Sequence, residues 1–214
     1  MSLPGEIGTF YRQRVPAQFN RTLARQRKAA IQDDRAAGIL EEMEAVRASI
    51  LVGVHADGHA GGHAIRVALD IEHGQMQSVD NPSWPPFLTL SHEGSDFESL
   101  RRECGDSVLG FLGGLAGLGD ELRLTSQRVR SLRELAGSLV LERTGADGFQ
   151  LRAHFGDGPP EPQPRATIRL DEATHRALRS GTMDPQEAFL SDAIEVHGDE
   201  GMAINLALTA LAPD

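Results

Sequence analysis

Residues 165–212 read RATIRLDEATHRALRSGTMDPQEAFLSDAIEVHGDEGMAINLALTALA and carry the clearest structural pattern in the sequence. The alternation of apolar residues over Ala166–Leu170 predicts a short strand. A helix is expected to begin at Asp171, whose side chain suits the N-cap, and to run to Arg179. Gly181 follows and ends that helix, because glycine readily adopts the conformation that terminates helices.

The second part of the stretch predicts a further helix, a strand and a last helix. Asp184 is typical of an N-cap and Pro185 of the first helical position. A strand is expected over Ala193–His197. Gly198-Asp199 then turns the chain into a helix over Gly201–Ala212.

The last helix is apolar on nearly every side. Its interior residues are almost all apolar, interrupted by Asn205 and Thr209. Such a helix must be covered on most sides, or it must line a cavity.

The order and spacing of these elements resemble the C-terminal half of the sterol carrier protein type 2 domain. The matching residues are Leu178, Gly181, Asp184, Pro185, Ala188, Phe189, Ile194, Val196, Gly198 and Asp199. The resemblance is clearest over residues 128–214. It implies an α+β fold in which an antiparallel or mixed sheet is covered by helices on one face.

In that family the last helix and the short helices before it wall an apolar tunnel, so the resemblance implies ligand-lining residues here. In the C-terminal part they are Met183, Phe189, Leu190, Ile194, Met202, Leu206 and Leu211. Phe111, Leu112 and Leu115 would occupy the matching place earlier in the chain. The alternative is that these residues close a filled core, because a core and a tunnel need the same residue types.

The preceding part of the chain repeats the pattern in weaker form. Strands are expected at Ser49–His55, Ala64–Glu72 and Phe87–Leu90, with a loop from Gly74 to Pro86. Asp120–Leu124 matches the strand expected near Asp192–Val196. The pairs Thr89-Leu90 and Phe111-Leu112 match Thr167-Ile168 and Phe189-Leu190.

We therefore expect an internal duplication with a pseudo-twofold arrangement. Residues 1–35 would be an N-terminal helical segment, residues 36–127 a degenerate sterol-carrier-like unit, and residues 128–214 the second unit. A helix near residues 128–136 would be shared, so that the units form one continuous body.

The composition limits the classes of partner. The net charge is −10, which opposes binding to the phosphates of nucleic acid. The single cysteine, Cys104, rules out an internal disulfide, and no apolar run reaches the length of a membrane span. These features, together with the lack of a signal-peptide pattern, predict a cytoplasmic protein. The sequence ends in Ala-Pro-Asp rather than a peroxisomal signal, which fits a bacterial cytoplasmic protein.

The arginine-rich segment Phe10–Lys28 has two interpretations. Its apolar residues recur at helical spacing, so it could lie on a membrane surface or dock a partner enzyme. The plainer interpretation is that this helix packs its apolar side on the body of the protein. A helix is also expected to continue from Ala30 to Arg47.

The chain offers few groups for catalysis. His55, His59 and His63 could approach one metal ion, but they lie in a glycine-rich loop, HADGHAGGH, where a solvated turn is the simpler interpretation. Cys104 follows Glu103, and an acidic neighbour disfavours the reactive thiolate. The leucine-interleaved glycines of Gly110–Gly119 lack the lysine of a phosphate-binding loop.

The sequence therefore predicts a non-catalytic carrier of an apolar small molecule, such as a lipid, fatty acyl chain, isoprenoid quinone or sterol-like compound, with no cofactor and no metal. The alternative is an interaction or accessory module with a filled core, which docks a partner enzyme through its N-terminal helix. The oligomeric state is left open.

Overall fold

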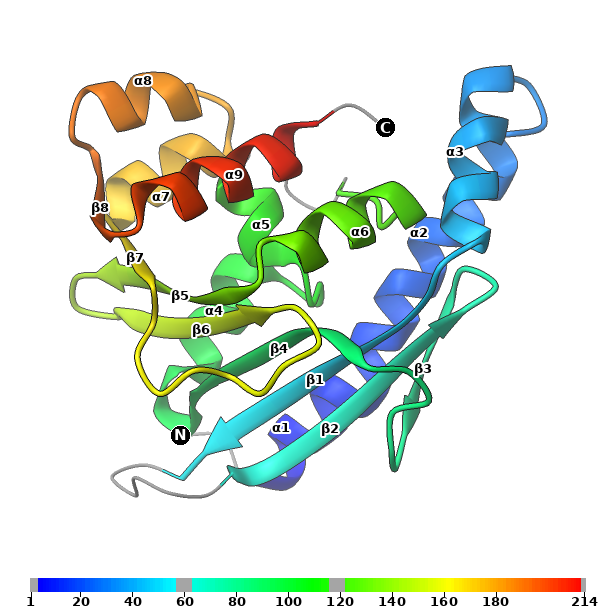
Figure 1. Ribbon diagram of the computed structural model, residues 1–214, viewed down its shortest axis with the longest axis horizontal. Helices are drawn as coiled ribbons and strands as arrows, with labels where there is room; N and C mark the ends of the chain where they lie inside the picture. Colours follow the sequence, from blue (N-terminus) through cyan, green and yellow to red (C-terminus); the bar gives the residue numbers. More distant parts are fainter. Residues whose placement is uncertain (1–3, 57–62, 116–121, 213–214) are drawn as a thin grey trace.

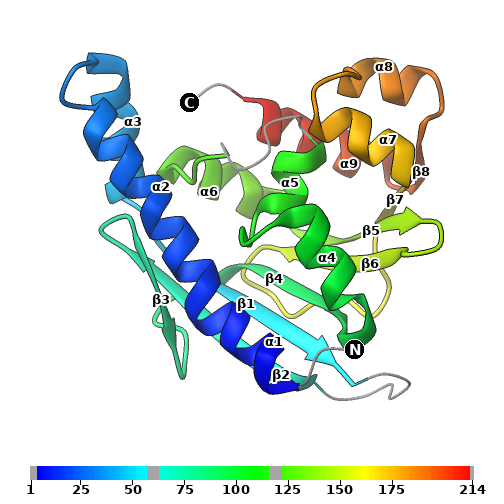
Figure 2. The ribbon, with the colours of Figure 1, turned by 180° about the vertical axis from the view of Figure 1, so that it is seen from behind.

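One eight-stranded sheet organises the molecule, and helices cover one of its faces (Figures 1 and 2). The computed structural model describes residues 4–56, 63–115 and 122–212. The strands are β1 (Arg47–His55), β2 (His63–Glu72), β3 (Gln75–Val79), β4 (Pro86–Glu93), β5 (Gly137–Thr144), β6 (Phe149–Phe155), β7 (Ala166–Asp171) and β8 (Ile194–Gly198). The predicted α+β class, with helices on one face of a mixed sheet, is confirmed.

Among the described residues, three α-helices precede the first strand, and the others lie between strands or after the last one. The helices are α1 (Pro4–Thr9), α2 (Val15–Ala29), α3 (Asp34–Glu44), α4 (Phe97–Cys104), α5 (Gly110–Leu115), α6 (Ser126–Glu134), α7 (Glu172–Arg179), α8 (Pro185–Leu190) and α9 (Glu200–Leu211). A π-helical turn, Phe10–Arg14, joins α1 to α2. Figure 2 shows α1, α2, α4 and α5 lying across one side of the strands.

The sheet order is β3-β2-β1-β4-β6-β5-β7-β8. Two pairs are parallel, β1 with β4 and β5 with β7, and the other neighbours are antiparallel. The strands β2-β1-β4 thus have the same order and relative directions as β6-β5-β7. A twofold axis would reverse the strand order, the strand directions or both, so the expected pseudo-twofold arrangement is wrong. The duplication itself stays a prediction.

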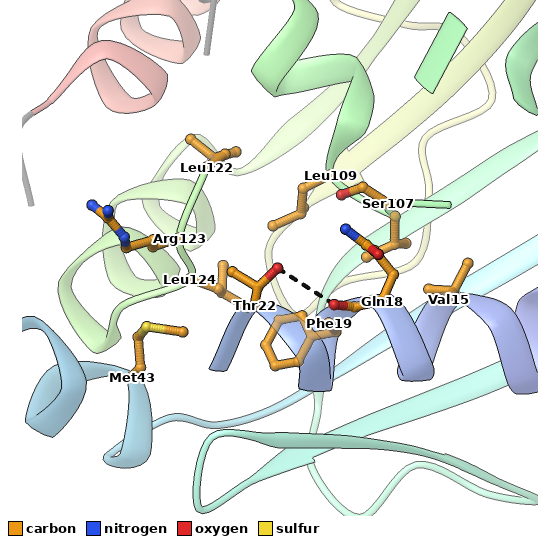
Figure 3. Close-up of a pocket in the computed structure, with 11 residues that line it drawn as sticks. Val15, Gln18, Phe19, Thr22, Met43, Ser107, Leu109, Leu122, Arg123 and Leu124 are labelled. Atoms are coloured by element: carbon orange, nitrogen blue, oxygen red, sulfur yellow. Dashed lines mark hydrogen bonds between the residues drawn. The ribbon is translucent and has the colours of Figure 1, made fainter. Parts of the chain in front are cut away.

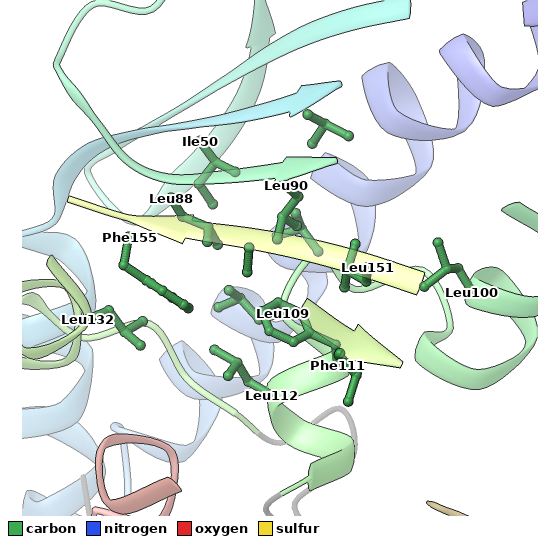
Figure 4. Packing of buried hydrophobic residues seen from close by; sticks show 14 of the residues in the cluster. Ile50, Leu88, Leu90, Leu100, Leu109, Phe111, Leu112, Leu132, Leu151 and Phe155 are labelled. Atoms are coloured by element: carbon green, nitrogen blue, oxygen red, sulfur yellow. The ribbon is translucent and has the colours of Figure 1, made fainter. Parts of the chain in front are cut away.

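The core lies between the sheet and the helices and extends through both halves. Alternate residues of neighbouring strands share this face, for example Ile50 with Leu88 and Leu88 with Phe155. Figure 4 shows these side chains directed towards Leu109 and Leu112 of the helical layer. All five are almost completely buried, so one continuous apolar core holds the two halves together.

The N-terminal helix packs its apolar side on this body. Phe10, Tyr11, Val15 and Leu23 are buried, and Phe10 meets Phe97 edge to face with ring centroids 5.1 Å apart. These aromatic residues therefore do not form the apolar face of a membrane-surface helix. The plainer interpretation of the segment is confirmed.

Three local expectations differ from the structure. The predicted loop after Gly74 contains strand β3, whose polar sequence QMQSV gave little sign of it. The continuous helix expected from Ala30 is interrupted, because the Asp33 side chain caps a new helix by accepting from the Arg35 amide at 3.0 Å. Residues 122–124 form no strand, and Asp120 lies outside the described residues.

A buried histidine fixes the N-terminal helix to β4. His92 Nδ1 donates to the Glu93 carbonyl at 2.7 Å, which leaves Nε2 to accept from the Tyr11 hydroxyl, also at 2.7 Å. Burial lowers the pKa of His92 to about 4; the bond to the Glu93 carbonyl opposes this shift, and nearby His55 adds to it. The imidazole is therefore neutral in the folded protein at neutral pH.

This pair predicts an acid-sensitive contribution to stability. The unfolded histidine titrates near 6.5 and the folded one near 4, so stability is unaffected above about pH 6.5 and declines below it. The decline attributable to His92 is about 1.4 kcal/mol per pH unit down to about pH 4. Urea denaturation of the wild type and of His92→Gln between pH 7 and 4 measures it. Equal pH slopes for the two proteins would contradict the assignment.

Candidate functional site

An apolar cavity of about 350 Å³ opens between α8, α9 and the strands beneath them. We call it the α8–α9 cavity. Its lining residues are Leu112, Ile168, Pro185, Gln186, Phe189, Leu190, Ile194, Val196, Ala203, Ile204, Leu206, Ala207, Leu208 and Ala210. Among these described residues Gln186 alone is polar, so the cavity offers a surface for apolar contact and one amide for hydrogen bonding.

Helix α8 forms the first wall of the cavity, and an N-cap and a proline fix the residue at which it begins. The Asp184 carboxylate accepts hydrogen bonds from the backbone N–H groups of Gln186 and Glu187 at 2.8 and 3.2 Å. Pro185 occupies the first turn. Helical spacing then directs Gln186 and Phe189 to the same side. The cap thus fixes where α8 begins, and Gln186 and Phe189 both line the cavity.

Helix α9 forms the second wall and divides its apolar residues between core and cavity. Met202, Ala203, Leu206 and Ala210 are buried, whereas Ile204 and Leu208 are 45% and 58% exposed. The exposed pair, with Phe189 and Leu190 of α8 at 38% and 82%, forms an open apolar rim. Exposed apolar residues gathered around a cavity are typical of ligand sites.

The N-terminal end of α9 is fixed by a cap and a glycine. The Asp199 carboxylate accepts from the Met202 amide at 3.0 Å and forms an ion pair with Arg165. The bond from the Met202 amide, followed by the contact with Arg165, lowers the pKa of Asp199. Gly198 has φ +93°, and a Cβ there would lie 2.3 Å from the Arg165 carbonyl oxygen, so this turn requires glycine.

The other end of α9 is held by Arg128 of α6. Its buried guanidinium donates to the carbonyls of Ala212 at 2.6 Å and Thr209 at 3.4 Å, and also to the Arg123 carbonyl at 2.5 Å. A cation at a helix C-terminus satisfies carbonyls that have no partner within the helix. Helix α9 is therefore anchored at both ends, with the cavity between the anchors.

The structure brings five of the predicted lining residues to the α8–α9 cavity: Leu112, Phe189, Leu190, Ile194 and Leu206. Met202 and Phe111 lie in the core instead, and Met183 packs against it. The side chains of Leu115 and Leu211 lie outside the described residues.

The expectation for the first unit is corrected. Leu112 lines the C-terminal cavity, and Phe111 is 1% exposed in the core. Near Phe111 the structure has a space of only about 30 Å³. The pocket in Figure 3, where Phe19 and Thr22 of α2 face Leu122 and Leu124, has a volume of about 20 Å³. Each holds about one water molecule and neither fits a lipid.

Sequence reasoning missed nine lining residues: Ile168, Pro185, Gln186, Val196, Ala203, Ile204, Ala207, Leu208 and Ala210. Ile168 and Val196 are paired in neighbouring strands, and their alternation with polar residues indicates the face of the sheet. Nothing in the sequence distinguishes that face as a cavity wall rather than core.

Two further hollows have similar volumes but a different chemistry. One, of about 350 Å³, lies between α3 and α6 and is lined by residues that include Arg35, Glu42, Gln127 and Arg128. The other, of about 310 Å³, adjoins α1 and α4 and includes Glu98 and Arg101. Their charged linings suit an apolar ligand less well than the α8–α9 cavity does.

Cys104 and the histidines of the glycine-rich loop do not form a catalytic or metal site among the described residues. Burial raises the pKa of the Cys104 thiol to about 12, so it is not a reactive thiolate at neutral pH. His59 lies outside the described residues, and among the residues that are described no cluster of three metal-ligating side chains is found.

Comparison with known protein families relates the C-terminal part of the chain to one of them. Residues 128–210 match the SCP-2 sterol transfer family. The family prediction is confirmed for this segment, which contains every element around the cavity except α5. The match does not extend over residues 36–127, so the degenerate first copy stays a prediction.

Solved structures of sterol carrier proteins are also similar to parts of the chain. Sterol carrier protein 2-like 2 from Aedes aegypti has 23% identity and a TM-score of 0.29, covering 35% of this chain and 74% of that one. Apo sterol carrier protein 2 from Yarrowia lipolytica has 17% identity and a TM-score of 0.29, with coverages of 37% and 75%. No curated protein sequence matches the chain.

None of the helices in the described part of the chain has the length and apolar character needed to cross a membrane.

The Arg128 anchor yields a stability prediction. Arg128→Met keeps much of the side-chain volume but removes the charge-assisted bonds to the end of α9, so we expect a loss of about 2 kcal/mol in unfolding free energy. Arg130→Met, an exposed change on the same helix, is the matched control and should lose less than about 0.5 kcal/mol. Urea denaturation measures both, and equal midpoints for the two variants would contradict the anchoring role.

Proposed function

We propose that the protein is a non-catalytic carrier that holds an apolar small molecule in the α8–α9 cavity. The observation that carries the proposal is the cavity itself, with its almost wholly apolar lining and a rim of exposed Phe189, Leu190, Ile204 and Leu208. The match of residues 128–210 to a family described as transferring sterols supports the same function.

The physical chemistry permits binding without any catalytic group. A ligand that buries about 400 Å² of apolar surface gains about 10 kcal/mol at ~25 cal/mol per Å². The loss of translational and rotational freedom removes several kcal/mol of this gain. An affinity of about 1 μM, near 8 kcal/mol, is therefore attainable.

The ligand class follows from the same lining. Sterols, fatty acyl chains and isoprenoid quinones all present an extended apolar surface with one small polar group, which the Gln186 amide could bond as donor or acceptor. A carrier role needs no group to act as acid, base or nucleophile. The open rim gives such a ligand a route in and out without unfolding of the core.

The proposal predicts that filling the cavity abolishes binding. Ala207 lines the cavity but is exposed, so Ala207→Trp places an indole at the mouth without crowding the core. Binding of Nile red, a neutral apolar dye, should weaken at least about tenfold, which corresponds to about 1.4 kcal/mol. Fluorescence titration measures the affinity.

The matched control is Asn205→Trp, which adds the same side chain to an exposed position of α9 outside the cavity lining. It should bind Nile red as the wild type does. Circular dichroism should show both variants folded. Unchanged binding by folded Ala207→Trp would show that the dye, and by extension the ligand, binds elsewhere.

A further inference from the structure

The segment that builds the mouth of the α8–α9 cavity is acidic. Residues 180–214 contain no lysine or arginine, and the segment from Asp184 to Glu200 contains six acidic residues, counting both ends. Two of the six, Asp184 and Asp199, act as helix caps. The segment that carries α8 and α9 therefore supplies acidic side chains, but no lysine or arginine, to the mouth of the cavity.

Two carboxylates lie beside the apolar rim. Glu187 precedes Leu190 by three residues on α8, and Glu200 precedes Ile204 by four on α9, so each pair is adjacent on its helix surface. All four side chains belong to exposed residues. A ligand whose polar end emerges at the rim thus meets negative charge on both helices.

The arginines on neighbouring elements are engaged by the chain itself. Arg165 pairs with Asp199, and Arg176 of α7 pairs with Glu172 at 2.5 Å. Arg179 donates to the Arg102 carbonyl at 3.2 Å, and Arg128 holds the end of α9. None of these four arginines is among the residues that line the cavity.

From this arrangement we infer that the cavity selects neutral apolar molecules over anionic lipids of the same chain length. The inference rests on the proposed carrier function and assigns the ligand class to the same site. An anionic headgroup left at the mouth is repelled by Glu187 and Glu200. The same headgroup drawn inside loses its hydration, and the lining has one polar side chain, that of the exposed Gln186, to replace it.

A neutral headgroup avoids both penalties. A hydroxyl or carbonyl can bond the side-chain amide of Gln186 in the cavity lining, or water at the rim, and carries no charge for the nearby carboxylates to repel. Alcohols, sterols and quinones therefore fit the site, whereas ionised fatty acids and phospholipids with net negative charge do not.

The test compares dodecanol with dodecanoate, which share one alkyl chain and differ in charge. Displacement of Nile red at pH 8 gives both affinities. Each exposed carboxylate contributes modestly, so the wild type should bind dodecanoate about two- to thirtyfold more weakly than dodecanol. The ratio should shrink towards one in the double variant Glu187→Gln/Glu200→Gln.

The matched control is Glu41→Gln/Glu134→Gln, which removes the same two charges at exposed positions of α3 and α6 away from the cavity and should keep the wild-type ratio. Equal or tighter binding of dodecanoate by the wild type would overturn the inference and leave the carrier function standing. Identical ratios in the two double variants would also overturn it, since the preference would then not arise from the mouth. Absence of binding by both compounds would overturn the inference and the carrier function together.

Discussion

The pairing of β4 with β6 joins the N-terminal and C-terminal strands into one sheet. It joins the two halves through the antiparallel register Leu88 to Phe155 and Leu90 to Ala153, and so makes one sheet with one buried face. It also occupies the edge of β4. In the C-terminal half the corresponding strand is β7, and its edge is taken by the short strand β8.

This difference explains why the cavity occurs at one end of the sheet. With β6 on the edge of β4, residues 122–124 have no free edge on which to form a strand like β8. The helical residues of the first half are then pressed into the shared core, as Phe111 is. At the other end of the sheet β8 is the last strand of the described residues, and the apolar sides of α8 and α9 meet there over a space instead of a packed layer. Anchors at both ends, Asp199 and Arg128, hold α9 over that space.

Much of the fold could be predicted from local patterns. Alternation of branched apolar residues from Ile65 to Ile71 with Arg66, Ala68 and Asp70 predicts β2. Asp184-Pro185 predicts the start of α8. Strand β3 was missed because an edge strand needs few apolar residues. The twofold arrangement was wrong because repeated local elements do not specify how two units pair across a sheet.

The candidate site could be predicted only in part, for a physical reason. The apolar residues of α9 are alike in sequence, yet Met202 is buried in the core while Ile204 and Leu208 border the cavity. Which side of α9 is covered depends on β7, β8 and the Arg128 contact, which are set by tertiary structure. The cavity contribution of Leu112 likewise depends on the packing of α5 against α7 and α9.

The central claim is that the α8–α9 cavity holds an apolar molecule, and the most direct measurement is the identification of what the purified protein carries. The protein would be extracted with organic solvent, and the extract compared by mass spectrometry with that of Ala207→Trp prepared in parallel. We expect a stoichiometric neutral lipid, quinone or sterol-like compound from the wild type and its loss from the variant. An extract equal to a protein-free blank, together with no saturable binding of Nile red, would show that the cavity holds no apolar molecule.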